Sequence, residues 1–268
     1  MNPSYPPVLR TAGRLRVETH ADRRTLGMAA ARATAGWLQE HLERHGEARV
    51  IFACAPSQDE FLDALTQPDA CGVRLAWDRI TVFHMDDYVG LTADHQQSFR
   101  HYLQRHLLSR ITPRRFHPIP AENSDSDRAC AMYAALLQAA PIDLICLGIG
   151  ENGHLAFNDP PVADFNDSVL VKRVALDDIC RQQQVNDGCF PALDRVPRHA
   201  LTLTLPVFRE AHRLSIHVPG LRKAAAVRST VFDPVGTTCP ATLLRQHPAA
   251  TLYLDAASAS LLPPVPVA

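Results

Sequence analysis

Two neighbouring carboxylates follow a strongly apolar run in the first half of the chain. The segment "ITVFHM" (80–85) predicts a buried strand, and Asp86 and Asp87 come directly after it. If the backbone stays extended through both residues, their side chains point to opposite faces. We therefore expect one carboxylate to enter a cleft and the other to hold backbone amides or to cap the following turn.

A glycine-rich segment, "LGIGENGHLAFNDPP" (147–161), follows another apolar run. Gly148, Gly150 and Gly153 match the pattern G-x-G-x-x-G of dinucleotide-binding loops. That fingerprint must open a helix, and the prolines at 160–161 cannot continue one. The match therefore does not indicate a dinucleotide site, and we expect a tight loop instead.

The same loop presents Asn152, His154 and Asp159 within eight residues. A histidine and a carboxylate on one loop can form a base and its orienting acid, because the carboxylate fixes the tautomer of the imidazole and supports its charged form. The alternative is that His154 only bonds a turn. The local pattern favours neither interpretation.

Two further segments could bind an anion. Lys223 lies in the first turn after a predicted strand, just beyond Gly220, where a helix N-terminus favours phosphate; taken alone, the segment favours an ordinary exposed lysine. In "CAPSQDEFL" (54–62), Ser57 could be an N-cap that forms a capping box with Glu60. The hydroxyl and the first amides of that helix could instead bind phosphate.

Six short apolar runs alternate with helical patterns along the chain. The predicted strands span 49–55, 80–85, 142–150, 200–205, 213–218 and 250–255. The predicted helices span 22–45, 57–67, 96–109, 126–140, 220–231 and 240–246. Most of the apolar runs are continuous, which is typical of strands covered on both faces. The alternation predicts an α/β fold, a doubly wound and mostly parallel sheet with helices on both faces.

The chain of 268 residues shows neither a linker composition nor an internal repeat. We expect a single domain over 1–268 with a frayed tail from about residue 259. The region 158–197 is rich in turn formers, as lids and walls of sites often are. In such folds ligands bind beyond the carboxyl ends of the strands, where the two carboxylates, the glycine-rich loop and 55–58 all fall.

Composition narrows the range of partners. The formal net charge of −1 suggests neither nucleic acid nor an anionic membrane, and no apolar run approaches the roughly 20 residues that span a bilayer. The seven cysteines are scattered without a C-x-x-C pair, which fits a reducing cytoplasm. Because the 13 histidines also lack the spacing of metal ligands, we expect neither a metal nor a cofactor.

Together these motifs resemble the glucosamine-6-phosphate deaminase/isomerase family, which shares its fold with 6-phosphogluconolactonases. "FHMDDYVGL" (83–91) is similar to the family's "MDEYVGL", and "GIGENGHLAFNDP" (148–160) is similar to its "G-x-G-x-D-G-H-I-A-F-N-E-P". "VPRHALTLTL" (196–205) and "VPGLRKA" (218–224) fall in the expected order and spacing. The likeness runs from about residue 20 to residue 255.

The resemblance implies a reaction that needs no cofactor. An amino-sugar phosphate, such as glucosamine 6-phosphate or its epimer galactosamine 6-phosphate, opens its ring, isomerises and loses ammonia to leave a ketose 6-phosphate. In this reaction Asp86 would move a proton between C1 and C2, while Asp87 would support the turn or a substrate hydroxyl. His154 would assist ring opening, oriented by Asp159, with Asn152 beside them.

The resemblance also implies a set of substrate-binding residues. Lys223 would hold the 6-phosphate together with the loop at Ser57 and Gln58, and Gly150 and Gly153 would shape the loop against the sugar. The assembly of this chain into a homo-oligomer stays open.

Three departures from the family pattern leave the exact sugar open. Asn152 replaces an aspartate, and an amide can accept a hydrogen bond but cannot supply charge. Asp159 replaces a glutamate, and "APSQDE" (55–60) replaces the glycine-rich "TGGTP". A 6-phosphogluconolactonase is one alternative, although such enzymes usually show "D-G-H-T-A-S" and "D-E-R" where this chain has "NGHLAF" and "DDY". A sensor that binds a sugar phosphate without turnover is the other, and Asn152 keeps it open.

Overall fold

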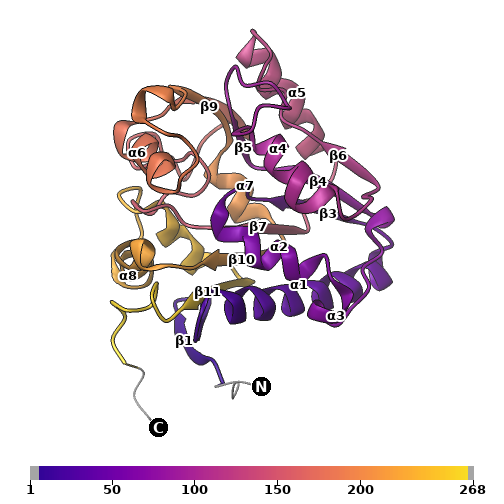
Figure 1. Cartoon of the computed structure of the whole chain (residues 1–268), viewed down its shortest axis with the longest axis vertical. Helices are drawn as coiled ribbons and strands as arrows, with labels where there is room; N and C mark the ends of the chain where they lie inside the picture. Colours follow the sequence, from indigo (N-terminus) through magenta and orange to yellow (C-terminus); the bar gives the residue numbers. More distant parts are fainter. Residues whose placement is uncertain (1–5, 265–268) are drawn as a thin grey trace.

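The computed structural model describes residues 6–264, which form one large and one small β-sheet (Figure 1). The large sheet has the strand order β1-β2-β11-β10-β7-β3-β4-β6, and its neighbouring strands are parallel except for the β1-β2 pair. Its strands are β1 (Val8–Ala12), β2 (Leu15–His20), β3 (Ala48–Phe52), β4 (Ile80–His84), β6 (Arg115–His117), β7 (Leu144–Leu147), β10 (Arg213–Val218) and β11 (Ala250–Asp255).

Helices cover both faces of this sheet. They are α1 (Arg23–His45), α2 (Asp59–Leu65), α3 (Pro68–Cys71), α4 (Phe99–Leu103), α5 (Ser126–Gln138), α6 (Asp178–Asn186), α7 (Leu205–Glu210) and α8 (Ala224–Phe232). Val50 and Phe52 of β3 pack with α1 and α2, whereas Ile51 belongs to the core on the opposite face with α5. Both faces of β3 are therefore buried, which explains its continuous apolar sequence. The predicted doubly wound α/β fold is confirmed.

A small antiparallel sheet stands beside the large one, with the strand order β5-β9-β8. Its strands are β5 (Asp86–Tyr88), β8 (Val171–Ala175) and β9 (His199–Leu203). The strand predicted at 200–205 is thus present, but it lies in this second sheet and not in the parallel one. Because β5 follows β4 after a single residue, the small sheet fixes the direction in which the chain leaves β4.

The ends of α1 show why this helix has its observed length. Asp22 and Thr25 form a capping box at its start, and Gly46 ends it with a φ of 86°, a backbone conformation that glycine adopts without strain. Of the two alternatives for Ser57, the capping box with Glu60 is wrong. Ser57 lies inside a short 3-10 helix, η1 (Pro56–Gln58), and α2 begins without a side-chain cap.

Several elements carry no clear sequence signal. The hairpin β1-β2 lies at the edge of the large sheet, where most of its strand residues stay partly or fully exposed. β6 has only three residues. The region 158–197, expected to be irregular, contains β8 and α6, and four of the nine residues of α6 are buried polar or thiol side chains. Its pattern therefore lacks the apolar stripe that predicts a helix.

The sheet has its topological switch between β3 and β7. The chain runs from β3 outward to β4 and β6, then returns to β7 on the other side of β3 and continues to β10 and β11. Adjacent loops leave in opposite directions at such a point, and a crevice opens between them. The loops after β3, β4, β7 and β10 meet there.

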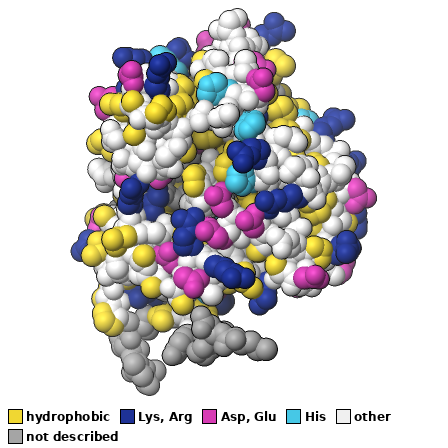
Figure 2. Space-filling model, in the orientation of Figure 1, with side chains coloured by type: hydrophobic (Ala, Val, Ile, Leu, Met, Phe, Trp, Pro, Cys, Tyr) yellow, Lys and Arg dark blue, Asp and Glu magenta, His cyan; other side chains and the backbone are white. Residues whose placement is uncertain are grey.

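Three features of the wider molecule bear on the predictions. No helix within the described residues is long and apolar enough to cross a membrane. Residues 259 and 262 pack against the core, so the chain stays held beyond the start of the expected tail, while 265–268 lie outside the described residues. On the face in Figure 2, basic and acidic side chains are interspersed.

Candidate active site

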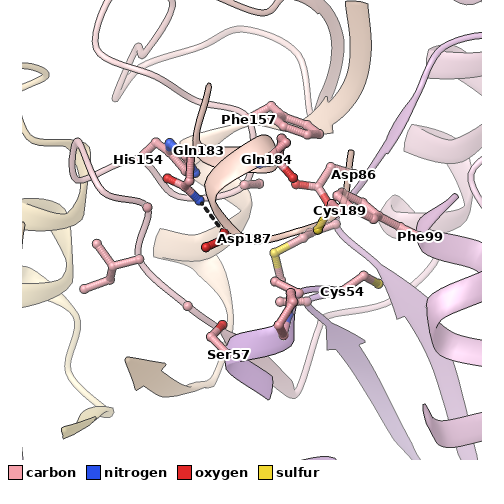
Figure 3. Close-up of a pocket in the computed structure, with 18 of the residues that line it drawn as sticks. Cys54, Ser57, Asp86, Phe99, His154, Phe157, Gln183, Gln184, Asp187 and Cys189 are labelled. Carbon is pink, nitrogen blue, oxygen red and sulfur yellow. Dashed lines mark hydrogen bonds between the residues drawn. The ribbon is translucent and has the colours of Figure 1, made fainter. Parts of the chain in front are cut away.

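The carboxyl ends of the central strands surround a cavity of about 150 Å³. The loops after β3, β4, β7 and β10 line it together with α4 and the end of α6 (Figures 1 and 3). Its lining residues are Arg23, Ala53, Cys54, Ala55, Pro56, Ser57, Met85, Asp86, Phe99, Gly148, Ile149, Gly150, His154, Ala156, Phe157, Gln183, Gln184, Asp187, Cys189, Pro219 and Lys223.

Asp86 and Asp87 point to opposite sides, as the alternation of an extended chain predicts. Asp86 lines the cavity, and its side chain accepts no hydrogen bond from the described residues. Asp87 is fully buried outside the cavity, where it accepts from the Ser98 hydroxyl at 3.0 Å and from Arg100 Nε at 2.8 Å. It also accepts from two backbone amides, those of residues 88 and 99. The structure therefore removes Asp87 from the substrate-binding set and gives it a supporting position.

The carboxyl group of Asp86 has an unusual electrostatic environment. Burial raises its pKa well above the ordinary value, and the negative charges of Asp87 and Asp159 raise it further. Burial disfavours the charged form, and nearby like charges do the same. Once ionised, this carboxylate is a stronger base than one in water, because it gains more by taking up a proton.

His84 holds the backbone of Asp86 in place. The Ile119 amide donates to His84 Nε2 at 2.7 Å, so the opposite ring nitrogen carries the hydrogen and bonds the Asp86 carbonyl at 2.9 Å. Burial lowers the pKa of His84 to about 4, which keeps the ring neutral. His84 lies inside the apolar run of β4, where nothing in the sequence pattern marks it as a positioning residue.

His154 and Asp159 form the expected pair. His154 Nδ1 lies 2.9 Å from Asp159 Oδ1, and both residues are buried. Burial raises the pKa of Asp159, but the positive charge and hydrogen bond of His154 outweigh it, helped by Asn152 and Cys180, so the pKa is lowered overall. Asp159 thus stays ionised and holds the hydrogen on Nδ1, which leaves Nε2 free as an acceptor. The structure therefore favours the pair over the alternative in which His154 only hydrogen-bonds a turn.

Asn152 joins the pair through both ends of its amide. Its Nδ2 donates to Asp159 Oδ1 at 2.8 Å, and its Oδ1 accepts from the backbone amide of His154 at 3.1 Å. An aspartate could not make the first of these bonds, because a carboxylate has no hydrogen to donate. Asn152 does not line the cavity, so its contact with the site runs through Asp159.

Gly150 and Gly153 shape the loop in different ways. A Cβ atom on Gly150 would lie 2.2 Å from His154 Cε1, so only glycine leaves room for the imidazole. Gly153 has a φ of +85°, and a Cβ there would meet Cys239 Sγ at 2.5 Å. Gly150 lines the cavity and Gly153 does not. We therefore keep only Gly150 as a residue that faces a ligand.

The two predicted anion-binding segments reach the same cavity. Lys223 ends a short 3-10 helix, η5 (Leu221–Lys223), and is 8 % exposed, so the interpretation as an ordinary surface lysine is wrong. Burial lowers its pKa, although the negative charges of Asp187 and Glu151 oppose that shift. Ser57 also lines the cavity, whereas Gln58 lies behind it, 1 % exposed. The structure thus removes Gln58 from direct contact with a ligand.

One wall of the cavity was missed by sequence reasoning. Gln183, Gln184 and Asp187, from α6 and the turn after it, face the cavity in Figure 3 together with Cys189. The Glu151 amide donates to Gln183 Oε1 at 2.8 Å, which joins α6 to the glycine-rich loop. The "RQQQ" segment has no motif for chemistry, so only its place in the fold reveals it.

One group of side chains within the described residues has the composition of a metal site. His154, Asp159 and Cys180 have ligand atoms within 4.8 Å of one another, and all are buried. Burial, together with the charge and hydrogen bond of Asp159, raises the pKa of the Cys180 thiol far above its ordinary value. Asp159 Oδ1 already accepts hydrogen bonds from His154 Nδ1 and Asn152 Nδ2, so in this structure these side chains form a hydrogen-bonded cluster.

Comparison with known proteins agrees with this geometry. The family model of glucosamine-6-phosphate isomerases/6-phosphogluconolactonase matches residues 21–253. A glucosamine-6-phosphate deaminase of Listeria innocua is 36% identical over 68% of this chain and 76% of its own. Another from Rhodopirellula baltica is 33% identical over 87% of this chain and 92% of its own.

Solved structures give the same result for the fold. A monomeric glucosamine-6-phosphate deaminase is 28% identical, with a TM-score of 0.83 over 91% of this chain and 99% of its own. A 6-phosphogluconolactonase from Shewanella baltica has a TM-score of 0.71 at 16% identity, over 92% of this chain and 97% of its own. The chain therefore belongs to the glucosamine-6-phosphate isomerase/6-phosphogluconolactonase family.

Proposed function

We propose that this chain is an amino-sugar phosphate deaminase. It converts glucosamine 6-phosphate, or an epimer such as galactosamine 6-phosphate, into a ketose 6-phosphate and ammonia. The observation that carries the proposal is the unpartnered carboxylate of Asp86, which lines the same cavity as His154, the imidazole bonded to Asp159. The deaminases among the related proteins, which are 33–36% identical, support the same reaction.

His154 is suited to opening the sugar ring. Because its Nδ1 hydrogen is held by Asp159, its Nε2 can accept a proton in the cavity. Nε2 takes the proton of the hydroxyl on C1, the bond between C1 and the ring oxygen breaks, and the same proton is returned to that oxygen. The ionised Asp159 stabilises the imidazolium formed between the two transfers.

Asp86 is suited to the next proton transfer. Its carboxylate removes the proton from C2 of the open-chain sugar while O1 takes a proton from the ammonium group on C2, which gives an enolamine. The carboxylate then returns its proton to C1, and an iminium remains at C2. Water adds to C2, the amine leaves as ammonia, and a ketone remains. The step calls for a positioned base with a raised pKa, and positioned acid–base catalysis contributes about 10²–10⁴-fold to a rate.

Ser57 and Lys223 are suited to the phosphate. They follow β3 and β10, the two strands on either side of β7, and both line the cavity. A cation and a hydroxyl are groups that bind phosphate oxygens. Gln183, Gln184 and Asp187, which line the same cavity, are suited to the sugar hydroxyls and the amine.

The test is ammonia release from glucosamine 6-phosphate and from galactosamine 6-phosphate, with hydrolysis of 6-phosphogluconolactone measured beside them. Ammonia from either amino sugar supports the proposal and identifies the epimer. Lactone hydrolysis alone would place the chain on the other branch of the family. Binding of the amino sugars without any product would identify a sensor.

Two further features remain predictions. A hydrolase of this kind is expected in the cytoplasm, which fractionation of the source cells can test. Assembly into a homo-oligomer is open, and light scattering of the purified chain would measure it.

A further inference from the structure

A continuous chain of buried hydrogen bonds ends at Ser57. Gln58 Nε2 donates to Ser57 Oγ at 3.0 Å, and Gln58 Oε1 lies 2.7 Å from His217 Nδ1. The other ring nitrogen of His217 lies 2.8 Å from Ser215 Oγ, which is 3.2 Å from Thr34 Oγ1. The chain thus runs from α1 across β10 to the cavity, and two of its four bonds, Thr34–Ser215 and His217–Gln58, join residues far apart in the sequence.

The direction of each bond follows from one carbonyl group. The backbone oxygen of His217 lies 3.4 Å from Gln58 Nε2, and because a carbonyl can only accept, the amide NH2 group must face it. Gln58 Oε1 then accepts from Nδ1–H of His217. The second ring nitrogen is left as an acceptor for the Ser215 hydroxyl, which in turn accepts from Thr34. Burial lowers the pKa of His217 to about 3, so the ring stays neutral.

The hydroxyl of Ser57, the last in the chain, therefore keeps its hydrogen available to donate. Ser57 Oγ already accepts from Gln58, and its own hydrogen has no acceptor among the described residues. A Cβ atom on Gly148 would lie 3.2 Å from both Ser57 Oγ and Gln58 Nε2, so a glycine at this position leaves room for the contact. The hydrogen of Ser57 is free to point into the cavity that Ser57 lines.

We propose that Gln58 and His217 are positioning residues that hold the Ser57 hydroxyl as a hydrogen-bond donor to the phosphate of the substrate. This inference rests on the proposed function for the identity of the phosphate. An ionised phosphate oxygen only accepts hydrogen bonds, so a hydroxyl free to present its lone pairs would bind it less well. The buried chain removes that freedom, and Lys223 supplies the charge.

The test measures the affinity for inorganic phosphate by calorimetry in three variants. His217→Phe keeps the ring packing against Phe61 but removes the 2.7 Å bond to Gln58 Oε1. Only the longer contact of 3.4 Å to the backbone oxygen of residue 217 then opposes rotation of the amide. Gln58 Oε1 can therefore turn to accept the Ser57 hydrogen, so affinity should fall about tenfold. Ser57→Ala should lose at least as much. The double variant should bind no more weakly than Ser57→Ala alone, because both changes remove the same bond.

A matched control separates positioning from packing. His247 is another buried histidine, which lies just before β11 and is bonded to the carbonyl of Ala211 just before β10. His247→Phe should leave phosphate affinity unchanged, whatever it costs in stability. If His217→Phe does not fold, as judged by thermal unfolding, Gln58→Glu replaces it. A carboxylate at 58 would accept the Ser57 hydrogen and weaken phosphate binding in the same non-additive way.

The outcomes also distinguish this inference from the proposed function. In the ammonia assay, His217→Phe should raise KM about tenfold with kcat within about twofold of the parent. If the variants change phosphate affinity as expected but the parent chain releases no ammonia, the deaminase is refuted and the positioning role stands. Additive effects of the two substitutions, equal losses in the His247→Phe control, or no phosphate binding by the parent chain would overturn the positioning role.

Discussion

The substitution Asp86→Asn tests the central claim about this site. Asparagine has nearly the same shape as aspartate, so the cavity and the backbone bond from His84 to residue 86 are kept. What disappears is the basic oxygen that moves the proton between C1 and C2. Loss of a positioned base costs about 10²–10⁴-fold in kcat, or roughly 3–5 kcal/mol in the barrier.

The same substitution should stabilise the fold. The pKa of Asp86 is raised in the folded chain by burial and by the charges of Asp87 and Asp159. A raised carboxyl pKa means that the folded state binds the proton more tightly than the unfolded state does, so stability falls as pH rises through the window between the two values. Asparagine never ionises and escapes this loss. The gain in the free energy of unfolding should be present at neutral pH and vanish near pH 3.

Ammonia release and urea unfolding, each measured across pH, check both halves of the prediction. The acid limb of kcat/KM in the parent chain should lie well above the ordinary aspartate pKa, because Asp86 acts in its ionised form. Asp78→Asn, at an exposed residue outside the cavity whose carboxylate has no partner among the described residues, is the matched control and should change neither quantity. A kcat within a few fold of the parent in Asp86→Asn, at any pH, would refute the role of this carboxylate.

The remaining predictions concern the loop and the phosphate. Gly150→Ala should lower kcat about 10²-fold, because the added methyl group displaces the imidazole of His154. As a control in α1, a Cβ atom on Gly36 would meet no atom within 4 Å, so Gly36→Ala should raise stability by roughly 0.5–1 kcal/mol in thermal unfolding. Asn152→Asp, the family's own residue, should lower stability by about 1–3 kcal/mol at neutral pH, because it replaces a donor to Asp159 with a like charge. Protonation of either carboxylate removes this repulsion, so the activity of Asn152→Asp should recover as the pH falls. An unchanged pH–rate profile would contradict the contact between residue 152 and Asp159. Lys223→Met should raise KM about 10–100-fold with little change in kcat, and equal losses in both constants would argue for a role beyond phosphate binding.

Local sequence determined much of this protein. The buried strands β3, β4 and β7 could be recognised because both of their faces are covered, which makes their sequences largely continuous apolar runs. β10 and β11 also read as strands, although each carries polar residues. The opposite orientations of Asp86 and Asp87 follow from the alternation of an extended chain. His154 and Asp159 are five residues apart on one loop, so the sequence could offer their pairing as one of two interpretations, and the structure supplied the contact.

Tertiary structure decided what depends on distant partners. Arg100 binds the carboxylate of Asp87 away from the cavity, which leaves Asp86 to face it. The polar helix α6 forms a wall of the site through its hydrogen bond with the glycine-rich loop. Ser57 is oriented by Gln58, which is held in turn by His217, 159 positions further along the chain. A sequence pattern reports the burial of its own segment, but the direction of a buried hydrogen bond depends on both partners, and folding alone brings them together.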